Sequence, residues 1–351
     1  MENLKRFCLV VVFFITVFFL SPVCFGERAD ANTGVKNKKL VLGYYTEDYP
    51  GDKLSYNSLL KNNSQLGTVA FFNYLVDQKG NLTTGQPVSQ GLKLADSCNI
   101  RTLALVHNMG RYNMAQTAHQ VLSVEKNRKN LEKNILSLVR GNGFDGVNID
   151  LEGVPPGDRA FYNKFLVELK QMFKPYGYLL TVSIPAKTAD NKFNAWNGAY
   201  DYRAIGQTAD LVALMTYDEH WKGGAPGPVA SLPWVQKVLD YSIKNIPRDK
   251  ILMGIPAYGY NWSAAGNSSV RWNETAALTA KYPWARWNDY YSTPYLIYYE
   301  KGAKHELWFE NKYSLGIKLD LANNYGVAGI AIWRLGFEDA SFWETLRAKF
   351  S

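Results

Sequence analysis

Cysteine is scarce in this chain. The 351 residues include three cysteines, and only Cys98 lies beyond the first 26 residues. If those residues are removed on export, neither an intramolecular disulfide nor a metal centre with cysteine ligands is expected. The four histidines also lack the spacing of metal ligands. We therefore expect no metal and no organic cofactor, and a fold that depends on a hydrophobic core, which a chain of this length is able to form.

Long apolar runs are absent beyond the start of the chain. There, two basic residues precede an apolar stretch over residues 8–20, and CFG at 24–26 offers a small-x-small cleavage site. This order predicts a secretory signal peptide over residues 1–26 and a mature domain over 27–351. An uncleaved anchor is the alternative, although the stretch is shorter than the roughly 20 residues of a membrane span. We expect export to the medium, the cell wall or the spore, without stable membrane association after cleavage.

Arginine-rich runs and nucleic-acid motifs are also absent. The formal net charge is +8, and loss of residues 1–26 lowers it by one because two basic residues and one acidic residue leave. The remaining basic residues are scattered along the chain. This distribution favours loose attraction to an anionic polymer such as a cell wall, and no nucleic-acid partner.

Apolar runs and helical segments alternate along the rest of the chain. The runs occupy residues 39–45, 67–74, 100–108, 144–152, 178–186, 209–217, 250–260 and 326–333. Most precede a segment with helical spacing, which is clearest after Asp158. Strands that alternate with helices and are apolar on both faces imply parallel pairing. Eight units predict an α/β fold of the closed (β/α)8 TIM barrel type, with catalytic groups at the carboxyl ends of the strands.

A doubly wound open sheet is the alternative fold, but no glycine-rich nucleotide fingerprint follows an early strand. One connection is too long for a single crossover helix, because residues 261–325 separate the seventh and eighth runs. We expect a small α+β insertion there, over about 265–322, beside the barrel mouth. Most of its many tryptophans and tyrosines are expected to form its own core.

Three polar side chains interrupt the fourth apolar run at alternate positions. Asn148, Asp150 and Glu152 lie within GFDGVNIDLEG, residues 143–153. Side chains two apart share one face of a strand, so these three are expected to face the barrel lumen. Two neighbouring buried carboxyl groups have pKa values pushed apart, which keeps one protonated at neutral pH. The alternative is a salt-bridged acid layer in the core, but the run has no basic residue of its own.

The spacing of the two acids limits the mechanism. Asp150 and Glu152 are ~7 Å apart along one strand, so they lie on the same side of a bound sugar. They cannot act as an acid and an opposed nucleophile across a glycosidic bond. Attack by the 2-acetamido oxygen of the substrate itself resolves this problem, with a carboxylate that orients the acetamide. We infer that Glu152, nearest the mouth, is the acid, and that the substrate is an N-acetylated polysaccharide.

The run DGVNIDLE, residues 145–152, resembles the signature of glycoside hydrolase family 18. The resemblance implies that Glu152 is the proton donor and that Asp150 orients the acetamide. Asp145 and Gly146 form the structural start of this motif.

Other strands resemble the same family. LMTYD at 214–218 is similar to its sixth-strand motif, which implies that Tyr217 donates to the acetamide, with Met215 and Asp218 nearby. GIAIW at 329–333 resembles its eighth strand, which implies that Trp333 forms the floor beneath the sugar. The runs GYY at 43–45 and GIPAYGYNW at 254–262 match the first and seventh strands. They add Tyr45 and Tyr258 to the expected substrate-binding residues. The alternatives are an ordinary strand aromatic for Tyr217 and a barrel plug for Trp333.

Asn148 stands where the chitinase form of the signature usually has aspartate. An asparagine cannot relay a proton, but we expect it to hydrogen-bond Asp150 and to contribute to substrate binding. Through this asparagine and the runs NIDLEGV, YDYRAI and HELWFEN, the sequence resembles the branch of bacterial spore-germination hydrolases that act on cortex peptidoglycan. The resemblance implies retaining hydrolysis of β-linked N-acetylglucosamine bonds. The alternatives are a chitinase, an endo-N-acetylglucosaminidase, or a non-catalytic carbohydrate-binding protein on the same barrel.

Overall fold

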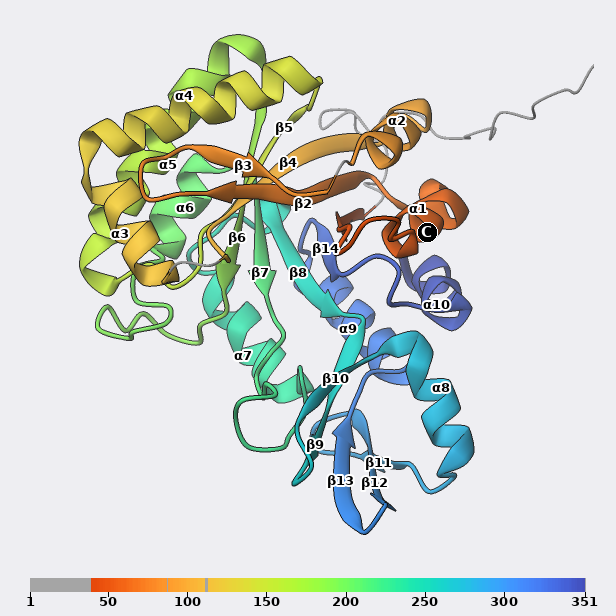
Figure 1. Cartoon of the computed structure of the whole chain (residues 1–351). Coiled ribbons are helices and arrows are strands. Elements are labelled where there is room, and N and C mark those ends of the chain that lie inside the picture. Colours follow the sequence, from red (N-terminus) through yellow and green to blue (C-terminus); the bar gives the residue numbers. More distant parts are fainter. Residues whose placement is uncertain (1–38, 87, 111–112, 351) are drawn as a thin grey trace, which may run out of the picture.

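Eight parallel strands close into a barrel (Figure 1). The structure, a computed structural model, describes residues 39–86, 88–110 and 113–350, so the predicted signal peptide lies outside it. The barrel strands are β1 (Leu40–Tyr45), β2 (Thr68–Val76), β4 (Arg101–His107), β5 (Gly146–Asp150), β6 (Leu179–Pro185), β7 (Leu211–Met215), β8 (Ile251–Pro256) and β14 (Gly329–Trp333). Closure is complete because β1 pairs in parallel with both β2 and β14. The predicted (β/α)8 TIM barrel is confirmed.

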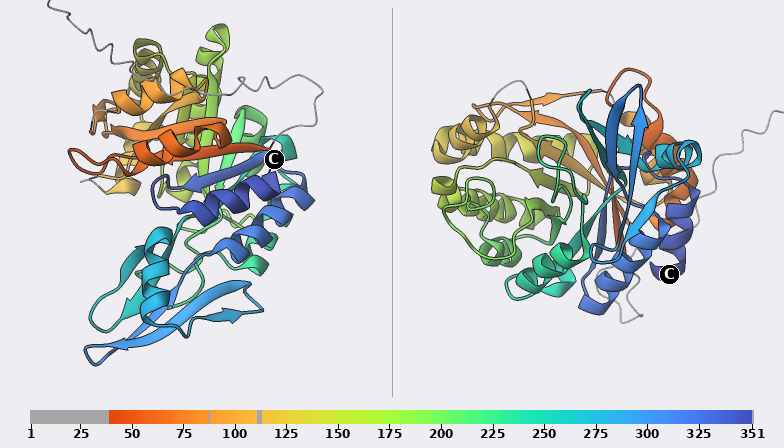
Figure 2. Two further views of the ribbon diagram at one scale, coloured as in Figure 1. Left: turned by 90° about the vertical axis from the view of Figure 1, so that its right-hand side faces the viewer. Right: turned by 90° about the horizontal axis from the view of Figure 1, so that it is seen from below.

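Helices surround the barrel and alternate with its strands (Figure 2). They are α1 (Leu54–Asn62), α2 (Ser89–Ser97), α3 (Met114–Ser123), α4 (Glu125–Asn142), α5 (Arg159–Phe173), α6 (Tyr202–Thr208), α7 (Leu232–Ser242), α9 (Lys312–Tyr325) and α10 (Ala340–Phe350). Short 3-10 turns are η1 (Asn63–Gln65), η2 (Pro156–Asp158), η3 (Lys174–Tyr176) and η4 (Arg248–Lys250). A short strand, β3 (Leu82–Thr84), forms a hairpin with β2 that the sequence pattern did not predict. None of the helices in the described ranges is long and apolar enough to span a membrane.

The core has two layers, as a barrel requires. The larger layer lies between the strands and the helices, and it includes Val147, Ile149 and Leu151 of the fourth apolar run. A smaller cluster fills the barrel lumen, where Leu42 and Tyr44 meet residues of the other strands. The outward-facing apolar side of β5 leaves its polar side to the lumen, as the alternation predicted.

The long connection forms a separate five-stranded antiparallel sheet that projects from the barrel (Figures 1 and 2). Its elements are β9 (Tyr258–Ser263), β10 (Ser268–Arg271), α8 (Trp272–Lys281), β11 (Arg286–Asn288), β12 (Thr293–Glu300) and β13 (Ala303–Trp308). The sheet begins at 258 and ends at 308, earlier at both ends than the expected 265–322. The reason is that β9 follows β8 almost directly, whereas α9 is a helix of the barrel.

Aromatic clusters cover both faces of the insertion sheet. One face carries Tyr258, Tyr260, Trp262 and Trp308, and Tyr217 and Trp333 of the barrel pack against them. The other face packs on α8 through a cluster that includes Leu296, Tyr298 and Phe309. Cys98, on the barrel, is disulfide-bonded in the structure. This differs from the expectation of no intramolecular disulfide. That expectation depended on removal of residues 1–26, which lie outside the described part of the chain.

Candidate active site

Two glycines and one aspartate bring β5 into the barrel. Gly143 ends α4 in the left-handed conformation, with φ at 72°. Gly146 lies against β6 so closely that a Cβ would stand 2.2 Å from the Leu179 carbonyl oxygen. Asp145 accepts a hydrogen bond of 2.8 Å from the backbone N–H of Thr102 and so ties the entry of β5 to β4. These contacts explain why the motif begins with Asp-Gly.

Asn148 lies deepest of the three polar residues and is fully buried. Its amide donates to Thr181 Oγ1 at 2.9 Å, and its carbonyl oxygen accepts from Ser183 Oγ at 2.9 Å. Ser183 also pairs with the Tyr44 hydroxyl at 2.7 Å. The expected hydrogen bond from Asn148 to Asp150 is absent from the described structure, because β6 supplies both partners of the amide. Asn148 therefore does not line the cavity, and its link to the site runs through Ser183 and Tyr44.

Glu152 lies just past the end of β5 and is held by Asn108. The Asn108 Oδ1 accepts from the Glu152 backbone N–H at 2.8 Å, and Nδ2 donates to the Glu152 carbonyl oxygen at 2.8 Å. A third bond runs from Asn108 Nδ2 to the Met114 carbonyl oxygen at 3.0 Å. Asn108 is 2% exposed, so water does not compete for these bonds. The backbone of the expected acid is thus fixed by a side chain from the end of β4.

A cavity of about 770 Å³ opens at the carboxyl ends of the strands. It brings together six of the predicted residues: Asp150, Glu152, Met215, Tyr217, Asp218 and Trp333. The volume lies within the range of small-molecule sites. No group of three or more histidine, cysteine, aspartate or glutamate side chains that could hold a metal occurs in the described ranges.

The structure corrects two of the predicted substrate-binding residues. Tyr45 is buried on the helix-facing side of β1, where its ring contacts Gly91 and Phe71, and its placement in the site was wrong. Tyr44 lines the cavity in its place because alternate residues of β1 face the lumen. Tyr258 lies behind the wall and donates to Asp218 Oδ1 at 2.5 Å, so it supports a cavity residue without lining the cavity.

The wall of the cavity depends on close packing around Tyr217. A Cβ at Gly254 would stand 2.8 Å from the Tyr217 ring, so glycine on β8 makes room for that ring. Asp218 has φ at 59°, and both Tyr258 and Tyr260 donate to its Oδ1. Trp333 packs against the ring of Tyr44, with centroids 5.3 Å apart.

Burial dominates the electrostatics of the site. It raises the pKa of Glu152 to about 7, with a further contribution from the negative charge of Asp218. Burial and the neighbouring Glu152 raise the pKa of Asp150 well above its usual range. Asp150 Oδ1 has no hydrogen-bond partner within the described residues. The pair therefore retains at least one proton at neutral pH, and Asp150 has an acceptor that the protein leaves unused.

Several cavity residues were missed from the sequence. They are Tyr44, Met109, Met114, Ser183, Pro185, Ala186, Trp196, Glu219, Trp221, Lys222, Trp234 and Tyr260. Glu219 and Trp221 could have been predicted, because they come just after the LMTYD run at the end of β7. Trp196 belongs to the connection between β6 and α6, whose course the sequence pattern does not give, and Trp234 lies in the first turn of α7.

We expect Asn108→Ala to lower kcat by about 10²-fold, because loss of both bonds frees the backbone of Glu152 to move. It should also lower stability by about 1–3 kcal/mol, since buried backbone groups lose their partner. Steady-state kinetics on a soluble oligosaccharide and thermal unfolding measure the two effects. Asn134→Ala is the control, because it removes a similar bond, to Gly80, away from the cavity. An unchanged kcat in Asn108→Ala would show that the clamp on Glu152 is not needed.

Comparison with known proteins identifies the family. The model described as "Glycosyl hydrolases family 18" matches residues 40–338. The "Uncharacterized glycosylase YvbX" of Bacillus subtilis is 36% identical over 319 residues, which cover 88% of this chain and 90% of that protein.

Solved structures of similar proteins agree with this family. The Bacillus cereus spore cortex-lytic enzyme SleL matches with a TM-score of 0.85 at 28% identity, over 91% of this chain and 76% of that one. The chitinase of Chromobacterium violaceum matches with a TM-score of 0.83 at 32% identity, over 89% and 99% of the two chains. This chain is therefore a glycoside hydrolase that belongs to family 18.

Proposed function

We propose that this enzyme cleaves β-linked N-acetylglucosamine bonds of peptidoglycan, with retention of configuration and with the substrate's acetamide as nucleophile. The observation that supports the mechanism is the buried Asp150, which has an unused hydrogen-bond acceptor. It lies next to Glu152, whose pKa is raised. An acetamide N–H would satisfy that acceptor and orient its oxygen toward the anomeric carbon. Glu152 then protonates the leaving oxygen and, after exchange of the sugar for water, acts as the base.

The wall polymer is favoured as substrate by two observations. The chain is similar over most of its length to a spore cortex-lytic enzyme, and its net charge of +8 attracts an acidic wall. We place its action in the wall or the spore. The chitinase likeness keeps chitin as the second candidate, because the same catalytic groups suit both polymers.

Product analysis tests this function. Protein cleaved to its mature form is incubated with purified peptidoglycan, cortex fragments and chitin oligomers, and the new ends are identified by mass spectrometry. We expect new N-acetylglucosamine reducing ends from the wall substrates, initially in the β configuration. Cleavage of chitin alone would move the enzyme to the chitinase group. Release of N-acetylmuramic acid reducing ends would contradict cleavage at the bond we propose.

A further inference from the structure

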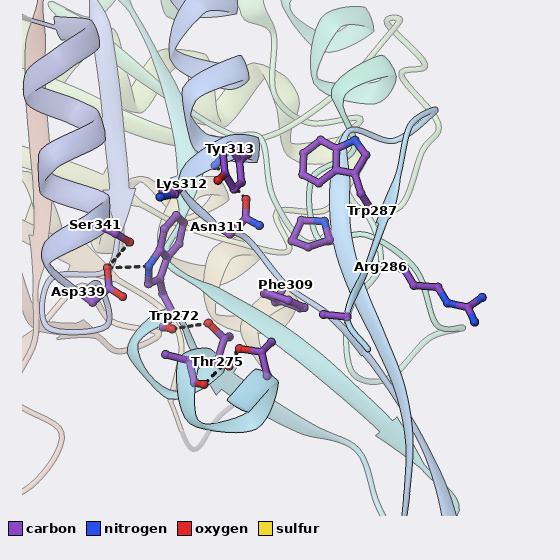
Figure 3. A pocket seen from close by; sticks show the side chains of 14 residues that line it. Trp272, Thr275, Arg286, Trp287, Phe309, Asn311, Lys312, Tyr313, Asp339 and Ser341 are labelled. Atoms are coloured by element: carbon purple, nitrogen blue, oxygen red, sulfur yellow. Dashed lines mark hydrogen bonds between the residues drawn. The ribbon is translucent and has the colours of Figure 1, made fainter. Parts of the chain in front are cut away.

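A second cavity, of about 640 Å³, lies on the other face of the insertion (Figure 3). It shares no lining residue with the catalytic cavity. Phe309, on the face of the insertion sheet that packs on α8, borders it, whereas Tyr260, on the opposite face, borders the catalytic cavity. Residues of α8 and β11 and the first turns of α9 and α10 meet around it. These two cavities thus lie on opposite sides of the insertion sheet.

Aromatic rings form much of this second cavity. Trp272 is buried, and its indole Nε1 donates to Asp339 Oδ1 at 3.0 Å, which fixes the ring. Trp287 on β11 and Tyr313 on α9 are 37% and 64% exposed, so part of each ring is open to a ligand. Exposed flat rings with a polar edge suit the apolar face of a sugar ring, which offers C–H groups on one side and hydroxyls at its rim. A volume of this size accommodates a small ligand.

Positive charge prevails at the same place. Arg286 and Lys312 both line the cavity, and neither forms an ion pair with another described residue. The one acidic side chain of the lining, Asp339, already accepts at Oδ1 from Trp272, from Ser341 Oγ at 2.6 Å and from the Phe342 N–H at 3.2 Å. Within the described residues, the lining therefore holds two cations without ion-pair partners, and its one carboxylate is occupied by neighbouring donors. An anionic ligand would compensate the excess charge.

We propose that this cavity is a second glycan-binding site, which takes a sugar ring with a negatively charged substituent, a carboxylate or a phosphate. The rings of Trp287 and Tyr313 stack on the sugar and Lys312 binds the substituent. Arg286, which points outward at the rim (Figure 3), adds positive charge to the approach. The proposal rests on the proposed function, because a peptidoglycan layer supplies such rings as part of the substrate polymer. A second contact with one polymer raises the local concentration of cleavable bonds at the catalytic cavity.

Binding is tested with the Glu152→Gln protein, which retains the catalytic cavity but is not expected to turn over. The parent, Trp287→Ala and the double variant Arg286→Gln/Lys312→Gln are titrated by calorimetry with three probes. These are a muramyl-peptide tetrasaccharide, a glycerol phosphate oligomer and chitotetraose. Trp284→Ala and Lys237→Gln are the controls, because they remove an exposed ring of the same insertion and a surface charge elsewhere.

We expect the parent to show a second, salt-sensitive site for an anionic probe that both test variants weaken about tenfold, the scale of one stacking or charge contact. If the variants lose affinity only for the muramyl probe, the carboxylate is the group that the site binds. If they lose affinity only for glycerol phosphate, the phosphate is that group. Equal binding of both anionic probes by parent and variants overturns the proposal. An equal loss of affinity for chitotetraose in the variants also overturns the proposal, because the site then does not distinguish an anionic sugar from an uncharged one.

Turnover separates this proposal from the proposed function. With Glu152 intact, Trp287→Ala should hydrolyse soluble oligosaccharides as the parent does and degrade insoluble wall more slowly. If no form of the protein cleaves any wall substrate, the proposed function fails, while the calorimetric result on the second cavity still stands.

Discussion

Glu152→Gln is expected to lower kcat by about 10²–10⁴-fold, the usual contribution of a positioned general acid. The amide keeps the shape of the side chain and the backbone bonds to Asn108, so KM should change little. In the unmodified enzyme, kcat/KM should fall tenfold per pH unit above about 7, where Glu152 loses its proton. Steady-state kinetics across pH 4–9 measure both effects. Glu344→Gln, the same change on the exposed side of α10, is the control.

The same substitution should raise stability at alkaline pH. Because burial raises the pKa of Glu152 in the folded state, folding is penalised as pH rises from the unfolded value near 4.5 to about 7, and the penalty is complete above that. Below pH 4 both states are protonated, so the variant should melt like the parent. A higher melting temperature at pH 8 with no gain at pH 4 is the expected pattern. Unchanged kcat would remove Glu152 as the acid. Absence of turnover in both parent and variant, with binding retained by both, would favour the carbohydrate-binding protein.

Asp150→Asn is expected to lower kcat by about 10²–10³-fold, the scale of one lost electrostatic contact in a transition state. Asparagine has nearly the same volume, but it cannot carry the negative charge that stabilises the attacking acetamide in the mechanism we propose. Binding of an uncleaved N-acetylated oligosaccharide should persist. Asp249→Asn, an exposed change at η4, is the control.

This variant should also shift the pH profile. The charge of Glu152 is one cause of the raised pKa of Asp150, and the two groups repel each other when both are ionised. Removing Asp150 as a charge should move the alkaline limb of kcat/KM to lower pH. A profile that stays in place, with kcat within twofold of the parent, would show that Asp150 neither orients the acetamide nor shares a proton with Glu152.

The fourth apolar run shows why part of the site could be predicted. Its lumen side is polar and its helix side apolar, so alternation alone assigned Asn148, Asp150 and Glu152 to one face. β1 has no such contrast, because it is buried on both faces and both Tyr44 and Tyr45 are aromatic. Periodicity cannot decide which of them faces the lumen. The partners of Asn148 on β6, Thr181 and Ser183, alternate with Val182 and Ile184, so their lumen-facing side carries the same signal as that of β5.

The eight barrel strands were predictable because each is a short, β-rich apolar run and most are followed by a helical segment. The hairpin strand β3 has three residues, two of them threonine, and lacks that signal. The insertion boundary was misplaced because β9 continues the apolar run of β8 with one residue between them. Cavity residues in connections, such as Trp196, depend on how loops cross the barrel mouth, which tertiary contacts decide.

The pairing of β9 with β13 has a consequence for folding. Register pairs such as Tyr260 with Trp308 bring the two ends of the insertion together within its own sheet. Once the sheet has formed, the long connection acts as a short loop between β8 and α9. The entropy cost of closing that loop is then close to that of a brief turn. The insertion can gain or lose residues at its far hairpins without delaying barrel closure. Its outer surface can thus change in sequence while the catalytic barrel keeps its folding route.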